Sequence, residues 1–307
     1  MCARMILNTL AIRQIIRHSI EMKNKKVRNL DHVVLATPDL EIARERLTAL
    51  GFTVAPDAQH SFGSENACVF FENGTFIEPL SIGQRETVED AIQKGNNFLR
   101  RDAAFRFRQG ENGFSMVVLG EPDPRSARKL LKKAGYETGK IVVVKRPGVK
   151  VHIALAIDAR SPDLTMFLCE RPDGPPSFPK DLTDHKNGAL GISAVYLHEQ
   201  LPEDFQYYLQ TVTGQREVRS HSFGMEMKLP NANISSLNSD GMKNYFGVDE
   251  LPTIRGMRAM AFDVKVKELS KLTKHLEKQE IDYKNISGRV IVDPADGQGA
   301  IISFREG

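Results

Sequence analysis

The sequence predicts an α+β protein made of four βαβββ modules, which pair into two domains with curved, mostly antiparallel sheets. Three observations support this class. Residues 30–52 and 115–136 match in one frame, shifted by 84 positions. The tetrapeptide His-Ser-Phe-Gly occurs at His60 and again at His221, 161 positions later. In the first repeat a β-branched run, an amphipathic segment and a hairpin signal follow one another.

The shift of 84 positions indicates a duplication, because many identities share this one frame. The identical pairs are Val33/Val117, Val34/Val118, Leu35/Leu119, Pro38/Pro122, Asp39/Asp123, Ala43/Ala127, Arg44/Arg128, Leu47/Leu131 and Gly51/Gly135.

The first copy predicts each element of the module in turn. A β-branched run predicts a strand over 32–36, and apolar residues at helical spacing predict a helix over 40–50. Gly51 ends that helix. Two more strands, over 67–71 and 75–80, flank an Asn-Gly dipeptide, which is a strong hairpin signal.

The third and fourth modules follow the same order. The third has a predicted strand over 191–197 and a helix over 201–214, and the fourth has a strand over 257–266 and a helix over 267–279. A hairpin over 288–304 closes the chain. The repeated His-Ser-Phe-Gly therefore falls at the same place in two modules, and we interpret it as a bend that both need.

A single module leaves one sheet face bare, so the modules must pair. This predicts one domain over 29–175 and a second over 188–307, joined by a Pro- and Asp-rich linker over 176–187. Residues 1–28 form a basic extension with one acidic residue. That extension is either a transit peptide or an upstream addition before an alternative start at Met22, and we assign it no function.

Composition excludes several function classes. With 42 Lys and Arg against 39 Asp and Glu, the net charge is +3, so no nucleic-acid footprint is visible. No apolar run reaches the roughly 18–20 residues that span a membrane. The cysteines Cys2, Cys68 and Cys169 make neither metal-ligand spacing nor a disulfide framework, which favours the cytoplasm. We expect a small-molecule substrate, with a second copy of the chain as a candidate partner.

Paired modules that begin LDHVVLATPDL resemble the vicinal oxygen chelate superfamily of glyoxalases, bleomycin-resistance proteins and extradiol dioxygenases. The sequence is most similar to the glyoxalase-like domain family within it. That family has an HPGWGTHN-like segment before the third strand and a YLEL-like fourth strand, which correspond here to HSFGSEN (60–66) and TFIEPL (75–80). The resemblance covers nearly all of the chain after residue 29, but the chemistry of the family is diverse.

The resemblance implies a divalent metal held by residues on the first and fourth strands of a module. The matching positions are His32 and Glu78, and imidazole with carboxylate suits Zn, Mn, Fe, Co or Ni. Such an ion would polarise a carbonyl or lower the pKa of bound water. A hydrogen-bonded His–Glu pair in a metal-free cleft is the alternative interpretation.

The repeat frame provides a comparison within the chain. The residues that align with His32 and Glu78 in the other modules are Met116, Ser193 and Met260 or Ala261 for the histidine, and the region 168–170, Ser235 and Ser303 for the glutamate. Only the first module keeps both ligand types. We therefore expect the metal in the N-terminal domain and none in the C-terminal domain.

Further ligands are less clearly defined. Glu65 stands where relatives have the histidine of GTHN, so it either replaces that ligand and acts with Glu78 as a catalytic carboxylate, or marks its loss. Glu170 or His152 of the second module would complete the shell across the module pair. His60 is another candidate, although its copy lies in a module without ligands.

Arg106 and Arg108 precede the second module. They are candidates for holding an anionic substrate at the mouth of the cleft by bidentate contacts. An exposed charge pair is the alternative. Cys169 is interpreted as a small buried residue rather than a nucleophile.

The leading hypothesis is a metal-dependent lyase, isomerase or dioxygenase acting on a small oxygenated metabolite. A metal-free protein that sequesters a small molecule, as in bleomycin resistance, is the competing class. The serines at ligand positions raise a third hypothesis, in which the C-terminal domain serves as a structural or dimerising partner.

Overall fold

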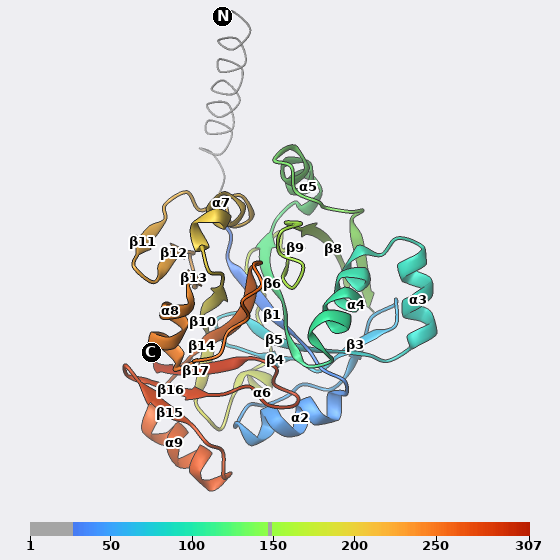
Figure 1. Cartoon of the computed structure of the whole chain (residues 1–307). Coiled ribbons are helices and arrows are strands. Elements are labelled where there is room, and N and C mark those ends of the chain that lie inside the picture. Colours follow the sequence, from blue (N-terminus) through green and yellow to red (C-terminus); the bar gives the residue numbers. More distant parts are fainter. Residues whose placement is uncertain (1–26, 147–148) are drawn as a thin grey trace, which may run out of the picture.

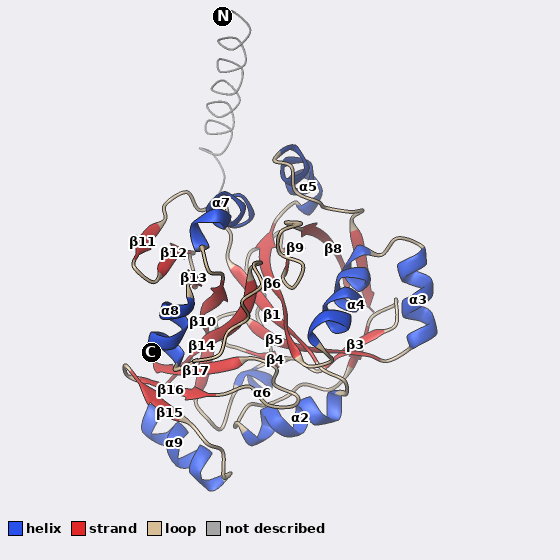
Figure 2. Cartoon of the chain, in the orientation of Figure 1, coloured by secondary structure: helices blue, strands red, loops and turns tan. Residues whose placement is uncertain are grey.

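The structure is a computed structural model that describes residues 27–146 and 149–307. Two curved sheets lie beside each other with helices around them (Figures 1 and 2). The basic extension over 1–28, with Cys2 and Met22, falls almost wholly outside the described residues. The mixed α+β class with two curved sheets confirms the predicted fold class.

Within the described residues the first sheet has nine strands. They are β1 (Leu30–Ala36), β2 (Ala58–Gln59), β3 (Ser64–Asn66), β4 (Val69–Phe70), β5 (Phe76–Ile82), β6 (Gly113–Glu121), β7 (Val142–Arg146), β8 (Val149–Ala156) and β9 (Thr165–Glu170). Their order is β2-β3-β5-β1-β6-β9-β8-β7, with β4 beside β5. At the centre, β1 runs parallel to β5 and antiparallel to β6.

The second sheet repeats this arrangement with eight strands in the described part of the chain. They are β10 (Ala189–His198), β11 (Arg219–His221), β12 (Gly224–Lys228), β13 (Asn233–Leu237), β14 (Arg258–Val266), β15 (Lys284–Ile286), β16 (Arg289–Val292) and β17 (Ile301–Glu306). Their order is β11-β12-β13-β10-β14-β17-β16-β15. Here β10 runs parallel to β13 and antiparallel to β14, as β1 does with its neighbours.

In the part of the chain that the structure describes, the helices lie between the strands in sequence. They are α2 (Leu40–Ala49), α3 (Arg85–Gln93), α4 (Asn97–Gln109), α5 (Pro124–Lys133), α6 (Lys180–Thr183), α7 (Gln206–Thr213) after a 3-10 turn (Pro202–Phe205), α8 (Ser239–Phe246) and α9 (Leu269–Lys278).

The duplicated helices α2 and α5 begin in the same way. Asp39 accepts a hydrogen bond from the backbone of Glu41, and Asp123 accepts from Arg125 and Ser126. No repeat pattern predicts a helix over 85–109. Helices α3 and α4 occupy that stretch, between the first two modules, so the repeat frame could not reveal them.

The first sheet has two faces with different partners. We call the face under α3 and α4 the inner face; it carries Val34, Val118 and Phe167, which pack with Phe98 and Leu99 of α4. Residues of the opposite face join a core that continues into the second sheet. The two sheets therefore share apolar packing, while the inner face is left to enclose a site.

Aromatic contacts mark the junction of the sheets. Phe114 of β6 meets Phe262 of β14 edge-on, with ring centroids 5.8 Å apart. Phe52 stacks on Phe304 at 6.0 Å. Asn231 also exchanges hydrogen bonds with the backbone N–H and C=O of Leu30, at 2.9 and 2.8 Å.

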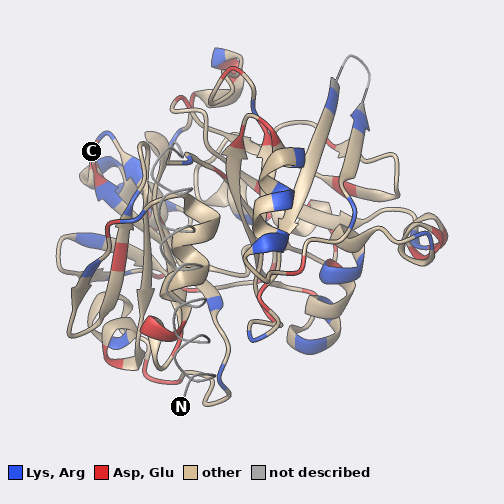
Figure 3. Cartoon of the chain, turned by 90° about the horizontal axis from the view of Figure 1, so that it is seen from above, with Lys and Arg blue, Asp and Glu red and all other residues tan. Residues whose placement is uncertain are grey.

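Charged residues of both signs are intermixed around both sheets (Figure 3). In residues 27–146 and 149–307 no helix has the length and apolar character needed to cross a bilayer.

Because the sheets share one core, we expect Phe262→Ala to destabilise the whole chain. The truncation removes a fully buried ring, which should cost about 3–5 kcal/mol of unfolding free energy. Urea unfolding followed by circular dichroism should show one shifted transition. Phe107→Ala is the control, since Phe107 is 92% exposed and its loss should change little. Two separate transitions, with only one shifted, would contradict the shared core.

Candidate functional site

A cavity of about 340 Å³ lies against the inner face of the first sheet. Most of its wall is apolar, and it is dominated by phenylalanine rings. The lining residues are Phe62, Phe70, Phe76, Phe98, Phe167, Phe178, Val144, Val151, Ile153, Pro176, Cys68 and Cys169, with the polar residues His32, His60, Asn66, Glu78 and Arg171. A volume near the lower end of the usual range of about 300–1,000 Å³ suits a small molecule.

The backbone places His32 and Glu78 together. The strands β1 and β5 are parallel neighbours, and side chains on alternate residues share a face, so both residues point to the inner side. The Nε2 atom of His32 lies 3.1 Å from Oε2 of Glu78. The His32 ring stacks on Phe76, with centroids 4.1 Å apart. The two residues that the sequence selected as metal ligands therefore meet in the cavity.

Behind His32 stands an ion pair that the sequence analysis did not include. Oδ1 of Asp31 lies 2.5 Å from Nδ1 of His32. Arg171 donates to both oxygens of Asp31, from Nε at 2.6 Å and from Nη2 at 2.9 Å. Because Asp31 accepts at Nδ1, the imidazole turns Nε2 toward Glu78. The one signal for this role was a carboxylate inside a strand whose residues other than Asp31 and His32 are apolar, where it needs a partner.

Glu78 has two further neighbours. Nδ2 of Asn66 donates a short hydrogen bond to Oε1 of Glu78. Nε2 of His60 lies 3.8 Å from the same oxygen, and Nδ1 of His60 lies 2.9 Å from the hydroxyl of Ser64. The structure thus brings His60 to the candidate site, and it adds Asn66, which the sequence analysis missed.

These contacts shift the ionisation of the pair. Burial opposes charge on Glu78, but hydrogen bonding and attraction from His32 outweigh it and lower the pKa of Glu78 to about 2. Burial also lowers the pKa of His32, yet its hydrogen bonds with Asp31 and Glu78 prevail, so its pKa is raised. Without a metal, the site favours an imidazolium between two carboxylates.

The donor chemistry fits a divalent cation. His32 and His60 direct Nε2, and Glu78 a carboxylate, toward the same region, which is a ligand set common for Mn, Fe and Zn. In the part of the chain that the structure describes, no group of three or more His, Cys, Asp or Glu side chains is already arranged around a common point as a metal site. Because His32 and Glu78 bond each other, an entering ion would have to displace a proton from His32.

Comparison with known proteins identifies the family of this chain. A family model described as a glyoxalase-like domain matches residues 30–213, more than half of the chain. The chain belongs to the glyoxalase-like domain family. A comparison with curated protein sequences gave no match.

Solved structures that are similar to this glyoxalase-like chain share its two-sheet fold. A hypothetical protein from Staphylococcus aureus aligns with a TM-score of 0.64 and 10% identity, over 92% of this chain and 100% of that one. A mutant of 4-hydroxymandelate synthase from Streptomyces coelicolor gives 0.61 and 10%, over 91% and 92%. The Mn(II)-bound glyoxalase from Novosphingobium aromaticivorans gives 0.59 and 11%, over 91% and 82%.

Other residues selected from the sequence lie elsewhere. Glu65 sits on β3 beside Asn66, and alternation turns it away from the cavity; its carboxylate packs against Gly83. Glu170 pairs with Nδ1 of His152 at 2.6 Å. Glu170 and His152 each lie next to cavity residues in sequence, so alternation places them on the opposite face of the sheet. None of these three lines the cavity of the glyoxalase-like site.

Arg106 and Arg108 also lie outside this cavity. Arg106 is buried and donates to Asp102 at 2.8 Å and to the carbonyls of Thr37 and Leu80 at 3.0 and 2.7 Å. Nε of Arg108 donates to Asp163 at 2.6 Å. Both guanidinium groups are engaged by the fold, so neither is placed to hold a substrate in the Phe-lined cavity.

The strand register refines the comparison among modules. Val34 is paired with Glu78, and in the second sheet Tyr196 is paired with Ser235. The residue two before Tyr196 is Ala194, so Ala194 rather than Ser193 stands where His32 does. The same irregularity in pairing occurs in β1 between Leu30 and His32 and in β10 between Ile192 and Ala194, which supports this alignment.

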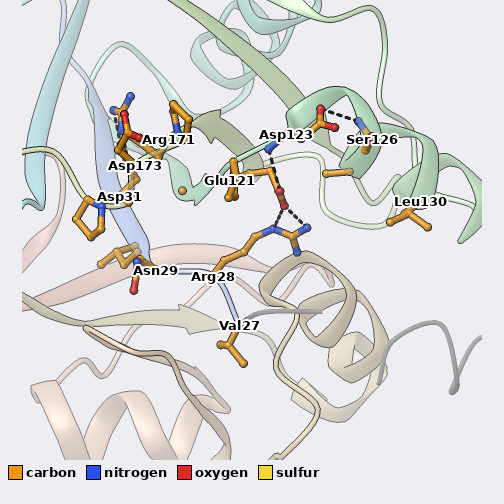
Figure 4. A pocket seen from close by; sticks show the side chains of 17 residues that line it. Val27, Arg28, Asn29, Asp31, Glu121, Asp123, Ser126, Leu130, Arg171 and Asp173 are labelled. Carbon is orange, nitrogen blue, oxygen red and sulfur yellow. Dashed lines mark hydrogen bonds and ion pairs between the residues drawn. The ribbon is translucent and has the colours of Figure 1, made fainter. Parts of the chain in front are cut away.

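A second cavity, of about 380 Å³, shares Arg171 with the first (Figure 4). It is more polar: Nε of Arg28 donates to Glu121 at 2.6 Å, and Asp123 accepts from the backbone of Ser126. Neither His32 nor Glu78 lines it, and both of its arginines are engaged by carboxylates. We therefore place the candidate reacting centre in the Phe-lined cavity.

Arg106→Met should destabilise the protein. Asp102 is 1% exposed, so loss of its cation leaves a carboxylate buried without charge compensation, at about 3–5 kcal/mol in urea unfolding. Arg106→Met/Asp102→Asn should recover part of this loss. Arg108→Met is the control, because Arg258 still lies 3.0 Å from Asp163. Equal losses for the two single variants would show that Arg106 has no special role.

The raised pKa of His32 gives a pH prediction for protein treated with EDTA. The folded state binds this proton more tightly, so its stabilisation is complete below the ordinary value of 6.5 and disappears as pH rises through the raised value. We expect the melting-temperature difference between wild type and His32→Gln to be largest below about pH 6.5 and to shrink as the pH rises through the raised pKa. A difference that grows with pH would disprove this ionisation scheme.

Proposed function

We propose that this glyoxalase-like chain is an enzyme that acts on a small, largely apolar metabolite, with His32 and Glu78 at the reacting centre and a divalent ion as cofactor. The proposal covers lyase, isomerase and oxygenase chemistry. The observation that carries it is the Glu78 carboxylate, which is 6% exposed in the wall of a Phe-lined cavity. Ionisable groups with strongly perturbed pKa values in such cavities are typical of functional sites.

His32, Glu78 and His60 are the residues that would hold the ion. When bound, a divalent ion supplies Lewis acidity, which polarises a carbonyl or lowers the pKa of water. A Mn(II)-bound glyoxalase among the similar folds supports this choice of cofactor.

The protein groups around the centre orient it and keep it dry. Arg171 fixes Asp31, and Asp31 fixes the ring of His32. Asn66 donates a hydrogen bond to one oxygen of Glu78, which fixes the orientation of the carboxylate. The phenylalanine rings exclude water, so the electrostatic interactions of these polar groups are stronger than in solvent.

The cavity favours a neutral substrate. Among its lining residues in the described chain, Arg171 is the one Arg or Lys, and both oxygens of Asp31 engage it. A substrate carboxylate or phosphate would therefore lack a bidentate cationic partner. We propose that the substrate places an oxygen atom at His32 and Glu78 and its apolar part among the phenylalanine rings.

A metal-free binding protein is the second candidate. Its support is that His32 and Glu78 already satisfy each other and that the described residues contain no complete three-ligand group. In that case the His32–Glu78 pair would bind the oxygen of a sequestered molecule by hydrogen bonds alone.

Metal analysis of the purified chain tests the two candidates. We expect close to one divalent ion per chain by elemental mass spectrometry, and a lower melting temperature after chelation, because an ion bound to the folded state stabilises it by about 2.7 kcal/mol at 100 times its Kd. His32→Ala and Glu78→Gln should each remove the ion.

Ser235→Ala and Ser303→Ala, at the matching positions of the second sheet, are the controls and should keep the metal. Full occupancy in the double variant His32→Ala/Glu78→Gln would place the ion elsewhere. A wild-type protein that stays metal-free after growth with added Mn, Fe, Ni and Zn would favour the binding protein.

A further inference from the structure

The segment between the two sheets forms part of the cavity wall. Its composition predicts a linker over 176–187, yet Pro176 and Phe178 line the cavity. Phe178 stacks on Phe70 with ring centroids 4.2 Å apart and meets Phe76 edge-on at 5.9 Å. Since Phe76 stacks on His32, a continuous set of rings joins this segment to the candidate reacting centre.

This wall is anchored on both sides of Phe178. Before it, Pro176 packs on the hairpin turn at Gly74, where a Cβ would come within 2.6 Å of the Pro176 carbonyl. After it, the backbone N–H of Thr53 donates to Nδ1 of His185 at 3.0 Å. Nε2 of His185 therefore carries the proton and donates to the Phe70 carbonyl at 2.9 Å. The segment is thus fixed to the same hairpin on which Phe178 rests.

Another part of the cavity wall has less freedom. Phe98 and Phe167 meet edge-on at 5.7 Å and are buried in the packing between α4 and the inner face. A larger ligand could displace them only by disturbing this core. Phe178 is half-buried at the boundary of the cavity, so its side chain sets how far an apolar group can extend from His32.

We propose that Phe178 is a specificity-determining residue, which limits how far the apolar part of a neutral ligand can extend from His32. The inference rests on the proposed function, because it assumes that the substrate occupies the Phe-lined cavity. It adds a limit on the reach of the apolar group and assigns the inter-sheet segment to the site.

Two neutral phenols test the size limit on the full chain by calorimetric titration. In the wild type, the binding free energy per non-hydrogen atom should be more favourable for phenol than for 4-phenylphenol, because the second ring of 4-phenylphenol meets Phe178. Phe178→Ala should weaken phenol by roughly tenfold, through the lost ring contact, and should tighten 4-phenylphenol. Phe178→Leu should fall between. Phe107→Ala removes an exposed ring outside the cavity and should change neither affinity.

A second measurement needs no ligand. Cys68 and Cys169 line the cavity, so their reaction with N-ethylmaleimide, followed by peptide mass spectrometry on native protein, reports access to it. Phe178→Ala should speed modification of both thiols by roughly tenfold relative to wild type, and Phe107→Ala should not.

The two measurements separate the two hypotheses. Faster modification of the thiols in Phe178→Ala would support the role of Phe178 as part of the cavity wall. If neither phenol binds the wild type in that case, the apolar substrate of the proposed function is refuted. Parallel weakening of both phenols, or unchanged thiol modification, would overturn the role of Phe178.

Discussion

The burial of the Glu78 carboxylate among phenylalanine rings is the constraint on which the rest of the site depends. An ionised carboxylate in an apolar cavity is costly unless a cation compensates it, and His32 is that cation. The second nitrogen of His32 then needs its own acceptor, Asp31, and Asp31 in turn needs Arg171. This series of charges ends at the residue where the chain leaves the first sheet, so the site and the crossover to the second sheet form one structural unit.

The duplication explains why one module can contain such a site while the other modules share only its backbone fold. Both sheets have the same central strand pairs, but the second sheet uses its inner polar residues for an internal network. The Tyr196 hydroxyl donates to Asp263 at 2.7 Å, and Arg289 donates to that hydroxyl at 3.2 Å. Serines stand where Glu78 stands in the first sheet, and the buried carboxylate of this network is Asp263 on β14 instead. The backbone is repeated, whereas the charges are particular to one module.

The difference between a metal site and a hydrogen-bonded pair lies in a single proton. Because the pKa of His32 is raised, the metal-free site favours its charged form, which cannot ligate a metal. A divalent ion held by His32 and Glu78 would replace that positive charge, so the carboxylate would be compensated in either state. This equivalence explains why one set of side chains suits both candidate functions.

The sequence by itself determined the modules, because strand alternation and the repeat frame are local patterns that a sequence displays directly. The sequence indicated the pair His32 and Glu78 through its resemblance to the glyoxalase-like family. It did not determine which neighbours join that pair. Glu65 and Asn66 are adjacent, and only the register of β3 decides that Asn66 faces the cavity. Arg171 and Phe178 reach the site from more than 90 residues away, through contacts between side chains that leave no periodic signal. Tertiary packing decided these, since compensation of a buried charge and closure of a cavity depend on proximity in space rather than in sequence.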